Sequence, residues 1–97
     1  MGREILALKP KVVDTIPRQL EDGILYVSLT FRTIIHKCCC GCGNPTVTPF
    51  PRNGTGWTVT VEQGESDNPL VTLEPSIFNT FECKSHYWIR QNRVVWA

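Results

Sequence analysis

Apolar and polar residues alternate along much of this chain, and the alternation predicts short β-strands. Residues 57–62, Trp-Thr-Val-Thr-Val-Glu, alternate strictly, which is the pattern of a β-strand. Residues 24–36 form the longest apolar segment and are rich in β-branched and aromatic side chains. Because the alternation holds from Val27 to Arg32 and then breaks, this segment predicts one long strand with a bulge near its end.

Turn-forming residues divide the rest of the chain into shorter strands. Pro17 predicts a single helical turn that ends at Gly23, a residue suited to positive φ. Pro75 is expected to end the strand before it, because proline cannot donate to a strand ladder. Together these signals indicate a small all-β domain, an antiparallel sheet or sandwich. The shorter strands are predicted at residues 12–13, 46–48 and 70–73, with a closing hairpin of 87–90 and 94–96.

Length and composition predict one globular domain over residues 1–97. An apolar content of 41% and a charged content of 20% are globular values, but a chain this short often needs a metal, a disulfide or a partner for stability. The net charge of +1 disfavours nucleic acid and acidic membranes as partners. No apolar run approaches the roughly 20 residues that span a bilayer, and residues 1–8 lack the apolar core of a secretory signal. We therefore expect a cytoplasmic protein without a membrane partner.

Cysteine and histidine fall into two clusters, and this is the strongest chemical signal in the sequence. Residues 36–43 read His-Lys-Cys-Cys-Cys-Gly-Cys-Gly, and residues 83–86 read Cys-Lys-Ser-His. Cytoplasmic thiols stay reduced, so clustered cysteines there favour metal binding over disulfides. Thiolate and imidazole ligands split between two loops predict a Zn²⁺ site that staples the β domain. The candidate metal ligands are His36, Cys38, Cys40, Cys42, Cys83 and His86, with Cys39 competing through its Cys-x-x-Cys-Gly spacing.

Two other metal sites fit parts of the pattern. His36-x-Cys38 with Cys83-x-x-His86 resembles the ligands of a Rieske-like 2Fe–2S cluster, although Rieske sequences place the cysteine before the histidine. A catalytic zinc would need an open coordination position and a general base. Ligands are instead in surplus, and the nearby acids Glu74 and Glu82 belong to no metalloprotease motif. A structural zinc site is therefore favoured, and such a site stabilises the fold directly.

A serine hydrolase built on Ser85, His86 and Glu82 does not fit the predicted strands. Neighbouring residues of a strand face opposite sides of the sheet, so Ser85 and His86 cannot meet. Glycines of a nucleophile elbow are also missing around Ser85. We expect Ser85 and Tyr87 to support a metal ligand instead, through a hydroxyl bond to a thiolate and by excluding water.

With these motifs in place, the chain resembles a bacterial family of predicted metal-binding proteins of unknown function. The shared motifs are Ile16-Pro17, Leu25-Tyr26, His36-x-Cys38-x-Cys40-Gly41-Cys42-Gly43, Pro75-Ser76-Ile77, Cys83-x-Ser85-His86-Tyr87-Trp88-Ile89 and Trp96-Ala97. Members are often encoded beside bacterial ubiquitin-like proteins and their E1-like and E2-like enzymes. The resemblance implies that Cys39 is not a ligand. The chain departs from the family at Phe78-Asn79-Thr80, where Gly-Asn-Trp is usual.

The resemblance and the residues together give a functional expectation. We expect a zinc-binding adaptor or ligase-like accessory protein of a bacterial ubiquitin-like conjugation system, with the metal structural. Its partner would be the E2-like enzyme or the ubiquitin-like modifier. The resemblance implies no established activity, and the ligand surplus favours a non-catalytic role. The alternatives are a small Rieske-like redox protein, which would be coloured, and a metallohydrolase.

Overall fold

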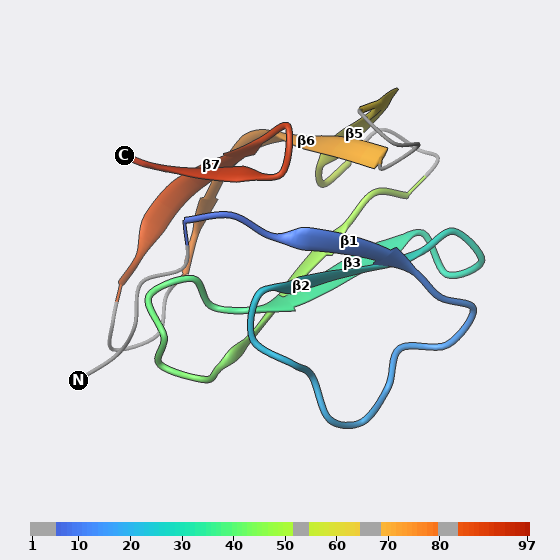
Figure 1. Cartoon of the computed structure of the whole chain (residues 1–97), viewed down its shortest axis with the longest axis horizontal. Helices are drawn as coiled ribbons and strands as arrows, with labels where there is room; N and C mark the ends of the chain where they lie inside the picture. Colours follow the sequence, from blue (N-terminus) through green and yellow to red (C-terminus); the bar gives the residue numbers. More distant parts are fainter. Residues whose placement is uncertain (1–5, 52–54, 65–68, 80–83) are drawn as a thin grey trace.

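Two four-stranded sheets make up the fold, and the prediction of an all-β domain is confirmed. The computed structural model describes residues 6–51, 55–64, 69–79 and 84–97. The first sheet contains, in spatial order, β1 (Lys9–Val12), β2 (Ile24–Ser28), β3 (Thr33–Lys37) and β4 (Pro45–Pro49). The second contains β5 (Thr58–Gln63), β6 (Pro69–Phe78), β7 (His86–Arg90) and β8 (Arg93–Trp96). Figure 1 shows one sheet lying over the other.

The sheets are built from neighbours in the chain, with one parallel pair. β1 runs parallel to β2, whereas every other pairing is antiparallel. Antiparallel neighbours need only short connections, which suits a chain of this length. Among the described residues, the structure holds no helix of the length and apolarity needed to span a bilayer.

The core lies between the two sheets and takes apolar side chains from both. Leu25 and Ile34 from the first sheet and Leu73 and Ile89 from the second are fully buried. Cys38 and Cys39 belong to the same buried cluster, so the start of the cysteine loop is packed into the core. Burying such aliphatic side chains contributes about 1.5–3 kcal/mol each, and this is what holds the sheets together.

The predicted single strand over residues 24–36 is wrong, because the chain turns back within it. β2 ends at Ser28, and β3 begins at Thr33 as its antiparallel neighbour. The backbone N–H of Phe31 donates to Ser28 Oγ at 3.3 Å, and Arg32 adopts a φ of 49°. A local bond from serine to a nearby backbone amide closes such turns. Leu29, one of the alternating apolar residues of this segment, lies in the turn and is exposed.

Two smaller predictions, a helical turn after Pro17 and a strand end at Pro75, are wrong, whereas the predicted closing hairpin is confirmed. The segment after Pro17 forms bends and a turn and contains no helical turn, although Gly23 has the expected positive φ of 80°. β6 continues through Pro75 to Phe78, at a place where its pairing with β7 shifts register. β7 and β8 form the predicted hairpin, whose two turn residues, Gln91 and Asn92, have φ of 48° and 69°. Positive φ at both positions matches the twist of the flanking strands.

Candidate active site and thiol cluster

The cysteine loop follows β3 directly and is closed by backbone hydrogen bonds. The Cys38 N–H donates to the Asn44 carbonyl at 2.8 Å, and the Gly41 N–H donates to the Cys38 carbonyl at 3.1 Å. Gly41 and Gly43 have φ of 91° and 86°, conformations that residues with a Cβ adopt only with strain. The two glycines thus allow the chain to curl so that several cysteines face one point.

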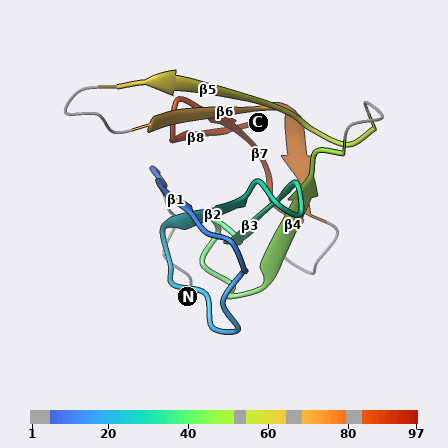
Figure 2. The ribbon, with the colours of Figure 1, turned by 90° about the vertical axis from the view of Figure 1, so that its right-hand side faces the viewer.

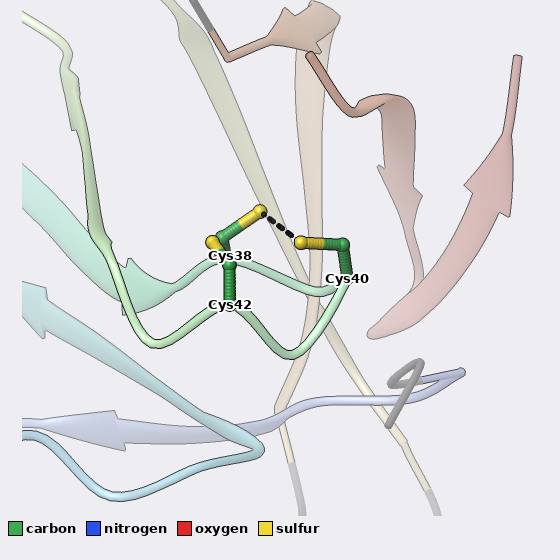
Figure 3. A group of neighbouring side chains, drawn as sticks. All are labelled: Cys38, Cys40 and Cys42. Carbon is green, nitrogen blue, oxygen red and sulfur yellow. Dashed lines mark hydrogen bonds between the residues drawn. The ribbon is translucent and has the colours of Figure 1, made fainter. Parts of the chain in front are cut away.

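Three of the predicted ligands come together in this loop. The Sγ atoms of Cys38, Cys40 and Cys42 all lie within 4.8 Å of one another, and Cys38 Sγ lies 3.4 Å from Cys40 Sγ (Figure 3). A tetrahedral zinc with Zn–S bonds of about 2.3 Å holds its sulfurs about 3.8 Å apart. The spacing and the soft donors therefore fit a metal ion, and these three cysteines could hold one. The identity of the ion does not follow from the spacing.

The other predicted ligands lie in different surroundings. His36 is fully buried, and its Nε2 lies 2.7 Å from the Tyr87 hydroxyl. His86 is exposed and contacts Ser76. Among the described residues, neither histidine belongs to the group of ligand atoms within 4.8 Å. Cys83 lies outside the described residues, so the four-ligand set and the exclusion of Cys39 stay predictions.

A buried polar network connects the thiol cluster to the second sheet. Its centre is Asn79, whose Nδ2 lies 3.3 Å from Cys38 Sγ, 3.0 Å from Ser85 Oγ and 3.4 Å from the Tyr87 hydroxyl. The Asn79 side-chain oxygen accepts from Thr46 Oγ1 in β4 at 3.0 Å. Ser85 Oγ lies 2.9 Å from Cys38 Sγ, which is the hydroxyl–sulfur contact expected from the sequence. Because Cys38 and Thr46 belong to the first sheet and its loop, the network joins both halves of the fold.

Burial favours the neutral forms of His36, Cys39 and Tyr87. It lowers the pKa of His36 to about 4 and raises the pKa of the Cys39 thiol to about 12. It also raises the pKa of Tyr87. Asn79 Nδ2 and the Cys39 N–H both approach the Tyr87 oxygen as donors, and the Tyr87 hydroxyl also contacts His36 Nε2 and the Cys39 side chain. The other ring nitrogen of His36, Nδ1, is buried and has no hydrogen-bond partner in the described part of the chain.

A second group of neighbouring polar and aromatic side chains lies on the face of the second sheet that is turned away from the core. The outer face, as we call the side turned away from the core, carries Ser76, Phe78 and His86, whereas Ile77 and Tyr87 point inward and are buried. Ser76 Oγ lies 2.7 Å from His86 Nε2. The Phe78 ring meets the His86 ring edge-on, with centroids 5.5 Å apart at 63°.

The pairing of β6 with β7 places Ser76 within reach of His86. β6 pairs with β7 at Leu73↔Ile89 and again at Ile77↔Tyr87, so four residues of β6 match two of β7. Continued without this shift, the Leu73↔Ile89 register would pair Ser76 directly with His86, and the extra residues of β6 displace Ser76 by two positions along the strand. Phe78 is then directly opposite His86, and Ser76 is the diagonal neighbour on the same face, within reach of a long side chain.

Sequence reasoning missed Ser76, although it had named the histidine. It assigned His86 to the metal and tested only Ser85 as a nucleophile. In the structure Ser85 points into the core toward Cys38 and His86 points outward, so the rejection of that pair was sound. The available signal was Pro75-Ser76-Ile77, which the family resemblance includes without a role. No spacing rule connects residues 76 and 86 without the register of β6 and β7.

The Ser76–His86 pair has the chemistry of an activated nucleophile. A serine hydroxyl is a weak nucleophile until a base accepts its proton, and a neutral imidazole nitrogen within hydrogen-bond reach is such a base. Contact through Nε2 leaves Nδ1 available for an orienting group, as in Ser-His-Asp enzymes. Both side chains reach the surface, so a substrate carbonyl can approach them.

Comparisons with known proteins agree with this chemistry. Residues 12–97 match the model of a protein family described as bacterial ubiquitination-like system serine protease (BubE). The match covers nearly the whole chain, including Ser76, His86 and the cysteine loop. Neither the curated proteins nor the solved structures contain a match to this chain.

Proposed function

The chain belongs to the BubE family of bacterial ubiquitination-like system serine proteases, and we propose that it is a serine protease with Ser76 as nucleophile and His86 as general base. The predicted association with a bacterial ubiquitin-like system is confirmed by the family. The observation that carries the catalytic proposal is the distance of 2.7 Å between Ser76 Oγ and His86 Nε2 on an accessible face. This proposal replaces the expectation of a non-catalytic accessory protein.

The reaction would proceed by acyl transfer. Ser76 Oγ attacks the carbonyl carbon of the scissile bond, and its proton moves to His86 Nε2. The tetrahedral intermediate collapses when the C–N bond breaks, and His86 returns the proton to the leaving amine. Water then attacks the Ser76 ester with His86 again as base, and the carboxylic acid leaves as Ser76 regains its proton. Each step uses only these two side chains, the substrate and water.

The substrate class follows from the family and from the exposed position of the pair. A protease of a ubiquitination-like system acts on proteins, and we propose that a ubiquitin-like modifier, as a precursor or as a conjugate, supplies the scissile bond. The reaction would take place in the cytoplasm, where the thiols of the cysteine loop stay reduced. An E2-like enzyme stays a candidate binding partner.

We further propose that the thiol cluster holds Zn²⁺ and stabilises the fold. Cys38, Cys40 and Cys42 would be three ligands, and Cys83 would be the fourth, because both imidazoles have Nε2 contacts elsewhere. The ion would complete a link between the cysteine loop and the start of β7, with Ser85 donating its hydroxyl proton to the Cys38 thiolate. The zinc would be structural, since Ser76 and His86 supply the chemistry.

The test compares Ser76→Ala with a matched control on the same sheet. The substrate is a ubiquitin-like modifier of the same system extended at its C-terminus, and a fluorophosphonate probe reports a reactive serine. We expect Ser76→Ala to lose cleavage and labelling, whereas Thr60→Ala, an exposed threonine of β5, keeps both. Full activity of Ser76→Ala would overturn the proposal. Cleavage that is lost on chelation but not in Ser76→Ala would indicate a metallohydrolase, and binding of the modifier or E2-like enzyme without cleavage would indicate an adaptor.

A further inference from the structure

The second half of β6 has an edge that no described strand covers. β5 pairs with β6 from Pro69 to Glu74, and β6 then continues to Phe78 with β7 alone beside it in the described part of the chain. Before β5, the chain moves away toward β4, where the Trp57 N–H donates to the Pro49 carbonyl at 2.9 Å. Figure 2 shows this half of β6 next to β4, and the Thr46–Asn79 hydrogen bond joins them at one end. The open edge begins after Glu74, so Pro75 and Ser76 are its first residues.

Backbone groups of β6 point toward this open edge at Phe78. The Asn79 N–H donates to the Ser85 carbonyl at 2.9 Å, and the Ala97 N–H donates to the His86 carbonyl at 3.0 Å. Residues of an antiparallel strand direct their N–H and C=O alternately to one neighbour and the other. Since Asn79 directs its N–H to the β7 side, the N–H and C=O of Phe78 point to the opposite side. A peptide strand laid there can bond to both groups.

A hollow of about 290 Å³ lies beside the same edge, between β4 and β6. Its walls include the apolar side chains of Val47, Trp57, Ile77 and Phe78. Thr46 and Asn79 also line it, and their polar groups bond to each other. The described lining contains no charged residue, so an uncharged apolar side chain fits and a charged one would lose its hydration without compensation.

We propose that an extended segment of the protein substrate binds as an added strand along the Ser76–Phe78 edge of β6 and places an uncharged, apolar side chain in the hollow between β4 and β6. This inference rests on the proposed protease function and names how its substrate is recognised. Ser76 is two residues from Phe78, about 7 Å along a strand. A peptide held by Phe78 thus presents a bond near Ser76 Oγ. Main-chain hydrogen bonds would supply affinity, and the hollow would supply selectivity.

The first experiment measures binding, so it does not depend on catalysis. A fluorescent, end-capped octapeptide library with Leu, Asp or Lys at each position in an alanine background is titrated against Ser76→Ala protein. We expect one position at which Leu binds at least about tenfold more tightly than Asp or Lys. In the best peptide, N-methylation of one backbone amide next to that position should weaken binding by about tenfold or more, because it removes one strand hydrogen bond. Equal binding of all peptides, or no effect of N-methylation at any position, would overturn the inference.

The second experiment changes the charge of the hollow. Val47 is 52% exposed and Val61, in β5, is 58% exposed, so either position accepts a lysine on folding grounds. In Val47→Lys, the affinity for the peptide with Leu at the selective peptide position should fall by about tenfold, and the affinity for the peptide with Asp there should rise by about tenfold. The matched Val61→Lys should keep the original preference. If wild-type cleavage depends on Ser76 but Val47→Lys and Val61→Lys have the same preference, the proposed role of the hollow is wrong and the protease function is retained. If the peptides bind as predicted but no cleavage is found, the protease function is wrong and the proposed binding at the hollow is retained.

Discussion

Ser85 and His86 are neighbours in the chain, yet their side chains point to opposite faces of the second sheet. Ser85 Oγ lies 2.9 Å from Cys38 Sγ in the core, and His86 Nε2 lies 2.7 Å from Ser76 Oγ on the outer face. Strand geometry makes this division necessary, because successive side chains alternate between the two faces. One short segment therefore joins the thiol cluster to the proposed catalytic pair while keeping their chemistry separate.

The first prediction concerns His86→Ala, which distinguishes two roles for His86. Loss of a catalytic base reduces cleavage and keeps the metal, whereas loss of a metal ligand releases the metal. If His86 is the base, its removal lowers kcat/KM by about 10²–10⁴-fold. The metal-to-chain ratio and the unfolding transition stay unchanged, because the side chain is exposed and contacts Ser76 and Phe78. Cleavage rates, elemental analysis and thermal unfolding of the same sample check this. Loss of metal in His86→Ala would return His86 to the ligand set predicted from the sequence.

The second prediction concerns Ser85→Ala, which should affect the metal and spare catalysis. Ser85 Oγ contacts Cys38 Sγ and Asn79 Nδ2, and groups that support a metal ligand commonly contribute about 10–100-fold in affinity. We expect zinc affinity, measured by competition with a chelating dye, to fall within that range. With zinc saturating, kcat should remain within about twofold of wild type. A loss of kcat equal to that of Ser76→Ala would show that the two faces are not independent.

Local patterns in the sequence predicted much of the fold. The strict alternation in residues 57–62, the turn residues of the closing hairpin and the cysteine-rich loop each depend on a few neighbouring positions, and each has a counterpart in the structure. The turn after Ser28 was missed because Leu29 and Phe31 are apolar yet 61% and 65% exposed. Apolar residues on the surface are common in folded proteins, so composition alone cannot separate this turn from a strand.

The proposed catalytic pair could not be predicted, because it depends on pairing between strands. Ser76 meets His86 across the β6–β7 pair, as the diagonal neighbour of Phe78, which lies opposite His86. A register that differs by one residue would direct Ser76 into the core. The sequence did identify His86 as chemically important, but the thiols nearby in the sequence suggested metal binding. The structure separates them by placing the imidazole on the outer face and the thiol cluster in the core and its adjoining loop.

The third prediction is that Asn79→Ala destabilises the fold more than an exposed amide does. Asn79 is 5% exposed and bonds Thr46, Ser85 and Cys38. Its removal leaves buried polar partners unsatisfied, at about 1–3 kcal/mol for each group that finds no replacement. We expect a loss of about 2 kcal/mol or more in the free energy of unfolding, measured by urea titration. Gln19→Ala, an exposed amide, should stay within about 0.5 kcal/mol of wild type.

The fourth prediction is that the native protein contains one zinc ion and is colourless. A ligand that binds only the folded state stabilises it by about 2.7 kcal/mol at 100 times its dissociation constant. For a chain of this size, chelation should therefore lower Tm by roughly 10 °C or more, and added zinc should restore it. Elemental analysis and the visible spectrum check the metal. Iron with visible absorption in aerobically purified protein would support the Rieske-like alternative.

The fifth prediction distinguishes Cys39 from the cysteines on either side of it. Cys39 is fully buried, its thiol pKa is raised to about 12, and its backbone N–H faces the Tyr87 hydroxyl. Cys39→Ser should keep the full metal-to-chain ratio and lose about 1–3 kcal/mol of stability, because a more polar hydroxyl replaces the thiol in the buried apolar cluster around Cys39. Cys40→Ser, one residue later and half-buried, should lose the metal. Elemental analysis of the paired variants measures both outcomes, and loss of metal from Cys39→Ser would make Cys39 a ligand.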